Sequence, residues 1–552
     1  MTDRSTDTAD DTDRSDAVDR TVSTSTVSTS AVFTHGVASF DPTDDRVILW
    51  TRAEGPSRLT WHLEPVDDTG SAAARSGPLD VDPEHGCAHI DVDGLEPGTE
   101  YRYWFTAGDE RSPIGRTRTS PGNDVAAWKV ALVCCADYSI NHLPVYRNVG
   151  RAEVDVVVHL GDYIYETSGK GERELEPDRD CVTLDDYHRR YSQVRRDPAT
   201  LAMHRHHPMI AIWDDHDLAD NAWLGGAKAH DPDEHGPWSE RVRAAAIARQ
   251  RWLPARLPDP DDVTKLWRSF RVGGLAELVV MDARLVGRDQ QAGDDGALPG
   301  DDPTRSRRGA EQRRWVEERI RDRSTRWCLL ATQIVLSPMC LPVTPGATLL
   351  DRAPSGYGIV DGEAMCTDEW DGYPEERRRV ARWLADRGGD ALIVSGDVHS
   401  AWVFDGELSP GVRAVAPEFV CPGVSSTPLG RQLPRGWRSI ADRMAEDGVD
   451  GRRWSDLEMW GYVTLHVSRS QVVGRWYAVD ARDPDSDAEL RATWAVDSGE
   501  PARVRPVGPQ LEVSSSRNPR WSRRRWAATL SAGGAVLAGA AVAVHRLRRA
   551  RR

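Results

Sequence analysis

The sequence predicts an α/β domain built on parallel strands, preceded by a small all-β sandwich. Beyond residue 127, short apolar runs end in clusters of polar residues and are joined by a predicted crossover helix, an order typical of parallel sheets. Before residue 122, short strand patterns alternate with Gly, Pro and Asp turns. The length of 552 residues exceeds that of one ordinary domain and allows a large core.

The first 30 residues consist mainly of Asp, Thr, Ser and Arg, and we expect a disordered tail there. They contain no apolar segment of the kind that forms a secretory signal peptide. The formal net charge of −16 argues against a general nucleic-acid-binding protein, because such proteins need a basic surface to replace counterions. Eight cysteines are present without a CxxC pair, so their spacing favours neither a zinc knuckle nor a disulfide framework.

A β-sandwich of structural role is predicted over residues 31–122. Short strand patterns occupy residues 46–51, 58–62 and 101–105. The turn from Leu95 to Tyr101 resembles the entry of a fibronectin- or immunoglobulin-like sandwich, in which a tyrosine packs across a corner.

The α/β domain is predicted over residues 127–480. The central segment of this domain runs from Val154 to Glu166. It begins with a run of β-branched residues typical of a buried strand, which Gly161 ends, and Asp162 follows directly. In open α/β sheets, functional residues collect just past the carboxyl ends of the strands. The other predicted elements are strands at 128–133, 209–213, 278–281, 327–332 and 391–396, helices at 145–153 and 311–321, and a closing hairpin at 461–467 and 472–477.

The C-terminal region is predicted to be a polar linker over residues 481–525, followed by a membrane helix over 526–544. The latter segment has nineteen uncharged residues, near the length of about 20 that a transmembrane helix needs. We therefore expect a membrane-associated protein with one C-terminal helix, and favour this over a soluble helix. Five arginines lie on each side, between 517 and 525 and between 546 and 552, so the sequence predicts no orientation in the membrane.

Four strand ends carry polar clusters whose joint occurrence favours a multinuclear metal centre. Close carboxylates repel one another unless a cation lies between them, and two-metal sites bind phosphoryl oxygens and activate water. Each cluster alone also allows a simpler interpretation, such as a helix cap, a core histidine or a small buried cysteine. The clusters are Cys135 with Asp137, Asp162 with Tyr165, Asp214 and Asp215 with His216, and Asp397 with His399.

Three blocks in this order resemble the signatures of PhoD-type alkaline phosphatases/phosphodiesterases, within the calcineurin-like metallophosphoesterase superfamily. The blocks are Gly161-Asp-Tyr-Ile-Tyr-Glu166, Trp213-Asp-Asp-His216 and Ser395-Gly-Asp-Val-His399. The resemblance covers about residues 32 to 480, and Thr34 to Pro42 is similar to the start of the family's N-terminal domain. It implies a four-layer αββα catalytic domain that hydrolyses phosphate esters with a multinuclear metal centre.

The same resemblance implies the cofactors Fe3+ and Ca2+, with other divalent metals as an alternative, and a role for each matching residue. The iron ligands would be Cys135, Asp162, Tyr165 and His399. Asp162 would bridge to calcium, and the further calcium ligands would be Asp215, Asp397 and Asn221. His216 would contact the scissile phosphate and could donate a proton to the leaving oxygen. Tyr163 and Glu166 receive no direct role, and no substrate-binding residue is predicted.

The sequence departs from the family pattern at three places. Cys134-Cys-Ala-Asp-Tyr138 stands where Ser-Cys-Gln-Asn-Tyr is more usual, Asp217 replaces a glutamate, and the family's usual twin-arginine export signal is not seen near the N-terminus. The changed first block also permits a catalytically degenerate, membrane-anchored binding protein on the same fold. The substrate, the preference for monoester or diester, and the oligomeric state are not predicted.

Overall fold

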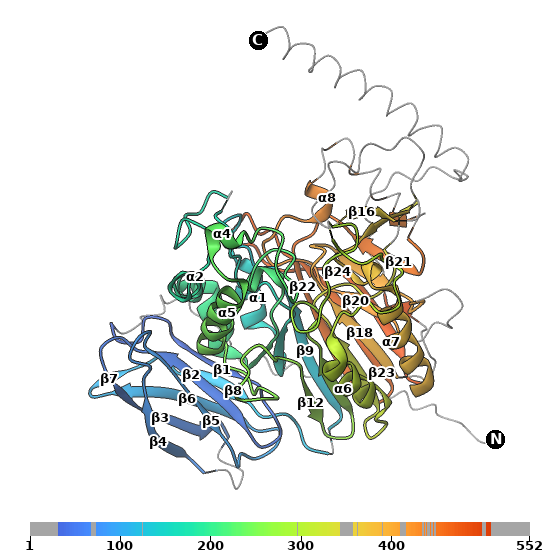
Figure 1. The fold of residues 1–552 in the computed structure, drawn as a ribbon. Helices are drawn as coiled ribbons and strands as arrows, with labels where there is room; N and C mark the ends of the chain where they lie inside the picture. The colour runs from blue at the N-terminus through green and yellow to red at the C-terminus, as the bar shows by residue number, and fades with distance from the viewer. Residues whose placement is uncertain are drawn as a thin grey trace, which may run out of the picture.

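The computed structural model describes residues 31–508, with gaps at 68–72, 124, 170, 295, 340, 343–356, 361–362, 389, 409–415 and 500–503, and at several positions within 433–448. Two large sheets and the helices outside them form the body of the molecule (Figure 1). A separate smaller sheet lies in the N-terminal region.

The first large sheet has ten strands in the order β25-β24-β23-β22-β9-β10-β11-β1-β2-β5. Its central strands β9, β10 and β11 are parallel, as the predicted crossover helix requires. The strand bounds are β1 Val37–Phe40, β2 Val47–Arg52, β5 Cys87–Val92, β9 Ala127–Val133, β10 Val156–His159, β11 Met209–Ala211, β22 Gly461–Ser468, β23 Gln471–Ala478, β24 Glu489–Asp497 and β25 Val504–Pro506.

The second large sheet has seven strands in the order β12-β13-β14-β18-β20-β19-β21. Strands β13, β14, β18 and β20 are parallel neighbours, so their carboxyl ends meet at one edge. The bounds are β12 Arg268–Val272, β13 Ala276–Val280, β14 Trp327–Ala331, β18 Ala391–Ser395, β19 Ala401–Phe404, β20 Glu418–Val420 and β21 Arg452–Asp456; a small sheet contains β15 Leu341–Pro342, β16 Tyr357–Val360 and β17 Glu363–Cys366.

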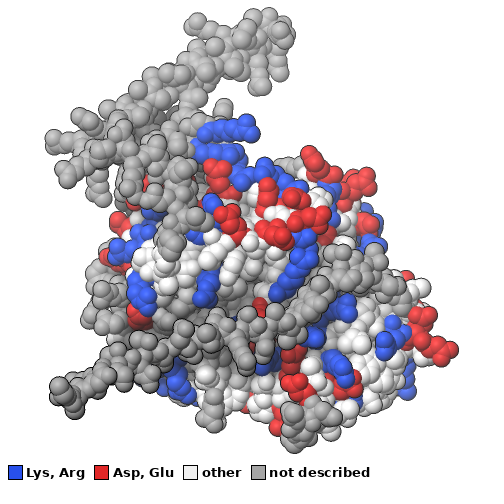
Figure 2. All heavy atoms as spheres, turned by 180° about the vertical axis from the view of Figure 1, so that it is seen from behind, with Lys and Arg blue, Asp and Glu red and all other residues white. Residues whose placement is uncertain are grey.

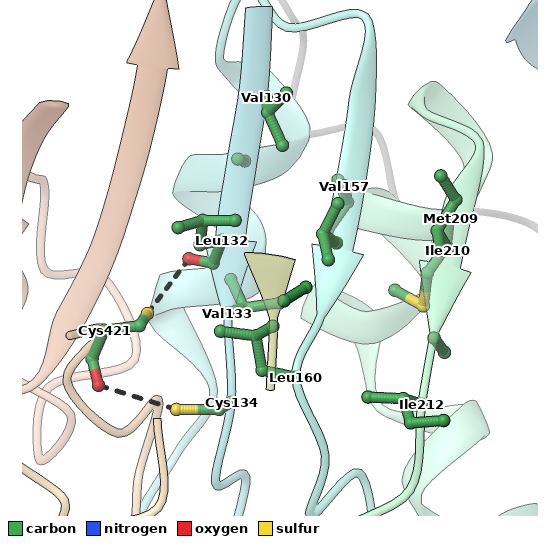
Figure 3. Packing of buried hydrophobic residues seen from close by; sticks show 14 of the residues in the cluster. Val130, Leu132, Val133, Cys134, Val157, Leu160, Met209, Ile210, Ile212 and Cys421 are labelled. Carbon is green, nitrogen blue, oxygen red and sulfur yellow. Dashed lines mark hydrogen bonds between the residues drawn. The ribbon is translucent and has the colours of Figure 1, made fainter. Parts of the chain in front are cut away.

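The two large sheets pack face to face, because one buried cluster contains Val157 and Ile210 of the first sheet together with Leu329 of the second. Figure 3 shows part of this packing around Val130, Val157 and Ile210. Helices cover both outer faces, and the predicted four-layer αββα arrangement is confirmed. The bounds are α1 Pro144–Arg151, α2 Leu184–Arg196, α3 Pro198–His206, α4 Pro232–His235, α5 Trp238–Trp252, α6 Gly309–Arg321, α7 Pro374–Arg387 and α8 Leu429–Gln432.

Local sequence accounts for where the main helices begin. Thr183 and Asp186 form a reciprocal capping box at the start of α2. Asp197 accepts the hydrogen bond of Ala199 N and thereby caps α3. Proline occupies the first turn of α1, α3 and α7, where its missing N–H costs nothing.

The N-terminal region forms a sandwich in which one layer is an extension of the ten-stranded sheet. Strands β1, β2 and β5 face the smaller sheet of β3 Arg58–Pro65, β4 Arg75–Asp80, β6 Glu100–Ala107, β7 Glu110–Arg111 and β8 Gly115–Arg118, with a core between them. Tyr101 Oη accepts a 3.0 Å hydrogen bond from Glu96 N, as the predicted corner requires. The sequence did not indicate that β1 pairs with β11, through Phe40 and Met209.

Two expectations for the C-terminal region are corrected. The predicted linker over 481–525 contains strands β24 and β25, which extend the ten-stranded sheet. No helix in the described ranges is long and apolar enough to cross a membrane; the longest, α5, has 15 residues. Residues 526–544 lie outside the described residues, so the described chain gives the predicted membrane attachment no support.

Charged side chains of both signs are mixed over the described surface visible in Figure 2. This distribution is typical of an ordinary protein surface with interspersed charges.

Candidate metal centre

Asp162 lies where the carboxyl ends of β9, β10, β11 and β18 meet, and three clusters of possible metal ligands share it. Within each cluster, the candidate ligand atoms lie within 4.8 Å of one another. Asp162 is fully buried, and its Oδ2 has no hydrogen-bond partner in the structure. The clusters are Cys135, Asp162 and His399; Asp162, Asp215 and His216; and Asp162, Asp214, Asp215 and Asp397.

The backbone at this centre is held in a conformation that residues other than glycine rarely adopt. Of the seven non-glycine residues with positive φ in the described chain, five are predicted ligands. Such conformations cost free energy and cluster at functional sites. Their φ angles are 59° at Cys135, 55° at Asp162, 58° at Asn221, 64° at Asp397 and 48° at His399.

Gly161 is required by the same geometry. Its φ is 118°, and a Cβ at this position would lie 2.3 Å from Asp214 Cβ. A side chain at residue 161 would therefore separate the β10 loop from the β11 loop.

One side of the centre carries a thiol, a phenol and an imidazole. Tyr165 Oη lies 3.2 Å from His399 Nε2, and His399 Nδ1 lies 3.2 Å from the carbonyl oxygen of Thr427. Burial is the main cause that raises the pKa of the Cys135 thiol and of the Tyr165 phenol well above their ordinary values. Without a cation, both groups hold their protons near neutral pH.

The other side carries carboxylates. Burial, followed by the charges of Asp214 and Asp215, raises the pKa of Asp162 against the opposing effect of His216. Asp215 behaves differently, because Arg284 and His216 outweigh its burial and lower its pKa. Four carboxylates gathered in one buried cluster repel one another, and a bound cation would offset this repulsion.

Asn221 lies beside this carboxylate cluster. Its backbone N–H donates to Asp215 Oδ2 at 2.7 Å. With its amide nitrogen turned toward the carboxylates, the side chain donates to the same oxygen at 3.2 Å.

His216 lies at the partly exposed side of the centre. Its Nδ1 is 2.7 Å from Glu166 Oε2, and its ring stacks on Tyr165 with 4.3 Å between ring centroids. Burial opposes protonation of the imidazole, but Glu166, Asp215 and Asp162 together raise its pKa well above the ordinary value. The imidazolium form is therefore favoured, and it can donate a proton.

Two further carboxylates beside the predicted ligands, Asp217 and Asp137, shape turns. Asp217 accepts hydrogen bonds from the backbone N–H groups of Asp162, Tyr163 and Ile164, so it fixes the β10 loop. Asp137 Oδ1 accepts from Ser139 N and Oγ at 2.9 and 2.8 Å.

Sequence reasoning missed Arg284, which is fully buried among the acidic residues. Its guanidinium contacts Asp214 and Asp368 and lies 2.9 Å from Asp397. The only available signal was its place two residues after Asp282, in the loop that follows β13.

Glu369 was also missed. It is buried among the acidic side chains. Burial and the nearby Asp397 raise its pKa well above the ordinary value. The sequence offered only its position within the acidic segment Asp368-Glu-Trp-Asp371.

Two facing sheets that gather a thiol, a phenol, imidazoles and carboxylates at their strand ends define a metal-dependent phosphoric ester hydrolase. The profile of the PhoD-like phosphatase family matches residues 130–476, and that of the PhoD-like phosphatase N-terminal domain matches residues 19–121. The chain belongs to the PhoD-like phosphatase family.

Individual relatives agree with this assignment. Alkaline phosphatase D of Bacillus subtilis (strain 168) is 32% identical over 474 residues, which cover 80% of this chain and 76% of the relative. The solved structure of PhoD superposes with a TM-score of 0.76 at 26% identity and covers 90% of this chain and 97% of that chain. These matches favour the hydrolase over the degenerate binding protein.

Proposed function

We propose that the protein hydrolyses phosphate esters with Fe3+ and Ca2+ held around Asp162. Cys135, Tyr165 and His399 would complete the iron site, and Asp215, Asn221 and Asp397 would complete the calcium sites. The observation that carries this proposal is the pair of clusters that share Asp162, one with thiol and imidazole and one with carboxylates only.

The donor set supports this division between metals. Calcium prefers carboxylate and amide oxygens, which are the groups on the Asp215 side. Phenol, thiol and imidazole suit a transition metal. The unpartnered, buried Asp162 Oδ2 is compatible with a ligand shared by the two sites.

When bound, the metal ions would supply Lewis acidity toward the phosphoryl group and toward water. The protein's own part would be positioning and proton transfer. Glu166 would hold His216 through Nδ1, and His216 would give its proton to the leaving oxygen. Arg284 would keep Asp214, Asp215 and Asp397 in place by charge.

We also propose that residues 31–122 have a structural role and that the catalytic unit begins near residue 127. The separate hydrophobic core of the N-terminal sandwich supports this division.

The experiment is hydrolysis of p-nitrophenyl phosphate and bis(p-nitrophenyl) phosphate by the purified protein, with iron and calcium supplied and metal content measured. We expect release of p-nitrophenol and a visible ferric–phenolate colour. Tyr165→Phe should remove the colour and most activity, whereas Tyr163→Phe should retain both, because Tyr163 Oη contacts His204 instead. A metal-loaded protein that hydrolyses neither compound would overturn the proposal.

A further inference from the structure

The loop of residues 421–427, which follows β20, contacts three of the four proposed iron ligands. Val424 N donates to Cys134 O at 2.9 Å, and Ser425 N donates to Cys135 O at 3.2 Å. Figure 3 shows the start of this loop, where Cys421 lies beside Cys134 and Leu132. The loop therefore fixes the backbone that presents the Cys135 thiol.

Ser426 of this loop contacts the phenol of Tyr165. Its Oγ lies 2.7 Å from Tyr165 Oη and 2.9 Å from Cys135 O, and the side chain is buried. Trp460 Nε1 donates to Ser426 O at 2.8 Å, so the backbone of Ser426 is held as well. A hydroxyl in this place has little freedom to turn elsewhere.

The same loop fixes the imidazole of His399. The carbonyl oxygen of Thr427 lies 3.2 Å from Nδ1 and can accept its proton. The Nε2 atom, which faces Tyr165 Oη at 3.2 Å, is then free to act as a ligand. Such hydrogen bonds behind metal ligands orient the ligands and adjust the metal's properties.

We infer that Ser426 is a positioning residue whose hydroxyl donates a hydrogen bond to the Tyr165 phenolate of the loaded site. This inference rests on the proposed function. The hydroxyl has one proton and two neighbouring acceptors, Tyr165 Oη and Cys135 O. Hydrogen bonds to ionised acceptors are about twice as strong as those to neutral ones, so loss of the phenol proton directs the bond to Tyr165.

The bond stabilises negative charge on the phenolate oxygen. Electrons on that oxygen are then held more tightly, and the phenolate donates less to a bound ferric ion. Removing the bond should shift the phenolate-to-iron absorption band to longer wavelength and make the ferric/ferrous reduction potential more negative.

The experiment compares Ser426→Ala with Ser425→Ala in the iron-loaded protein by visible absorption and redox titration. Ser425 is a matched control, because it is equally buried in the same loop and its Oγ donates to Asp137 O at 2.9 Å instead of to a proposed ligand. We expect the shifts in Ser426→Ala alone. Ser426→Cys retains a weak hydrogen-bond donor and should give a smaller shift. This variant replaces Ser426→Ala in the comparison if the alanine variant does not fold.

The outcomes separate this inference from the proposed function. An unchanged band and potential in both Ser426 variants, or equal changes in Ser425→Ala, would overturn it while hydrolysis remains. A colourless wild-type protein that still hydrolyses phosphate esters would also overturn it, since no ferric phenolate would then exist. If the metal-loaded wild-type protein hydrolyses no phosphate ester, the proposed function itself is rejected.

Discussion

Glu166 Oε2 lies 2.7 Å from His216 Nδ1, and Glu166 Oε1 accepts a hydrogen bond from Asp220 N at 2.7 Å. Glu166 is fully buried, so both oxygens of its carboxylate are used in the protein interior. The pair combines orientation of the imidazole with a charge that favours its protonated form.

Replacing Glu166 by Gln should slow hydrolysis of esters with poor leaving groups by about 10²-fold, because general acid catalysis is typically worth that much or more. Esters with good leaving groups, such as p-nitrophenyl, need less protonation and should be affected much less. The measurement is kcat for a series of aryl phosphates of increasing phenol pKa. An equal loss across the series would indicate that Glu166 only supports the fold.

Arg284 should contribute strongly to the free energy of unfolding, because it is the buried cation among several carboxylates. Arg284→Met would leave Asp214 and Asp397 without their buried cation, whereas Asp368 keeps its ion pair with Arg288, and breaking a buried ion pair costs about 3–5 kcal/mol. Urea unfolding of the metal-free protein measures this loss. Arg321→Met is a suitable control, because its ion pairs with Glu317 and Asp386 are largely exposed and should contribute about 0–1 kcal/mol. Equal midpoints for the two variants would contradict the expectation.

Metal binding to the metal-free protein should release protons. Burial keeps the Cys135 thiol and the Tyr165 phenol protonated near neutral pH, and both must lose their protons to act as ligands. We therefore expect at least two protons for each iron bound, because the pKa of Asp162 is raised as well. Calorimetric titration in buffers of different ionisation enthalpy gives this number. Tyr165→Phe should lower it by one, and binding without proton release would exclude these two residues as ligands.

Stability should decrease below pH 6.5, because several buried histidines are held neutral. Burial, then the neighbouring His85, Arg251 and Arg52, lowers the pKa of His188 to about 3. The unfolded chain takes up a proton at His188 near pH 6.5 and the folded chain only near pH 3. This group therefore lowers the free energy of unfolding by about 1.4 kcal/mol for each pH unit between those values, while its contribution is fully present above pH 6.5.

His188→Gln should make the dependence of unfolding free energy on pH less steep between pH 4 and 6. Trp252 Nε1 donates to His188 Nδ1 at 2.8 Å, and the glutamine oxygen can replace this acceptor. The exposed His142 gives the control His142→Gln. Identical slopes for wild type and His188→Gln between pH 4 and 6 would contradict a neutral, buried His188.

Much of the fold was predictable from local patterns. The β-branched run before Gly161 and the apolar run before Asp397 became the buried parallel strands β10 and β18. A continuous apolar run indicates a strand that is buried on both faces. A polar residue directly after such a strand lies at the end of the sheet where the carboxyl ends of the strands meet. The same reasoning brought Asp162, Asp215 and His399 to one place.

The remaining features depend on contacts between distant parts of the chain. In the sequence Arg284 is one arginine among many. Its carboxylate partners Asp214, Asp368 and Asp397 follow β11, β17 and β18, so only the folded chain brings them to the loop after β13. Strands β24 and β25 lie in a polar region whose sequence resembles a linker. Their structure depends on the pairing of β24 with β23 and of β25 with β24. No motif in the sequence marks Ser426, and only its contact with Tyr165 in the folded protein indicates a role.

The pairing of β1 with β11 has a consequence for fragments of this protein. Arg268 and Asp41 reinforce the junction through a buried ion pair of 2.8 Å. A fragment that began after residue 122 would leave the short strand β11 with open N–H and C=O groups. It would also leave Arg268 without its counter-charge Asp41. Open strand edges promote association between chains. By pairing with β11, strand β1 thus removes an open edge from the strand that leads into Asp214, Asp215 and His216.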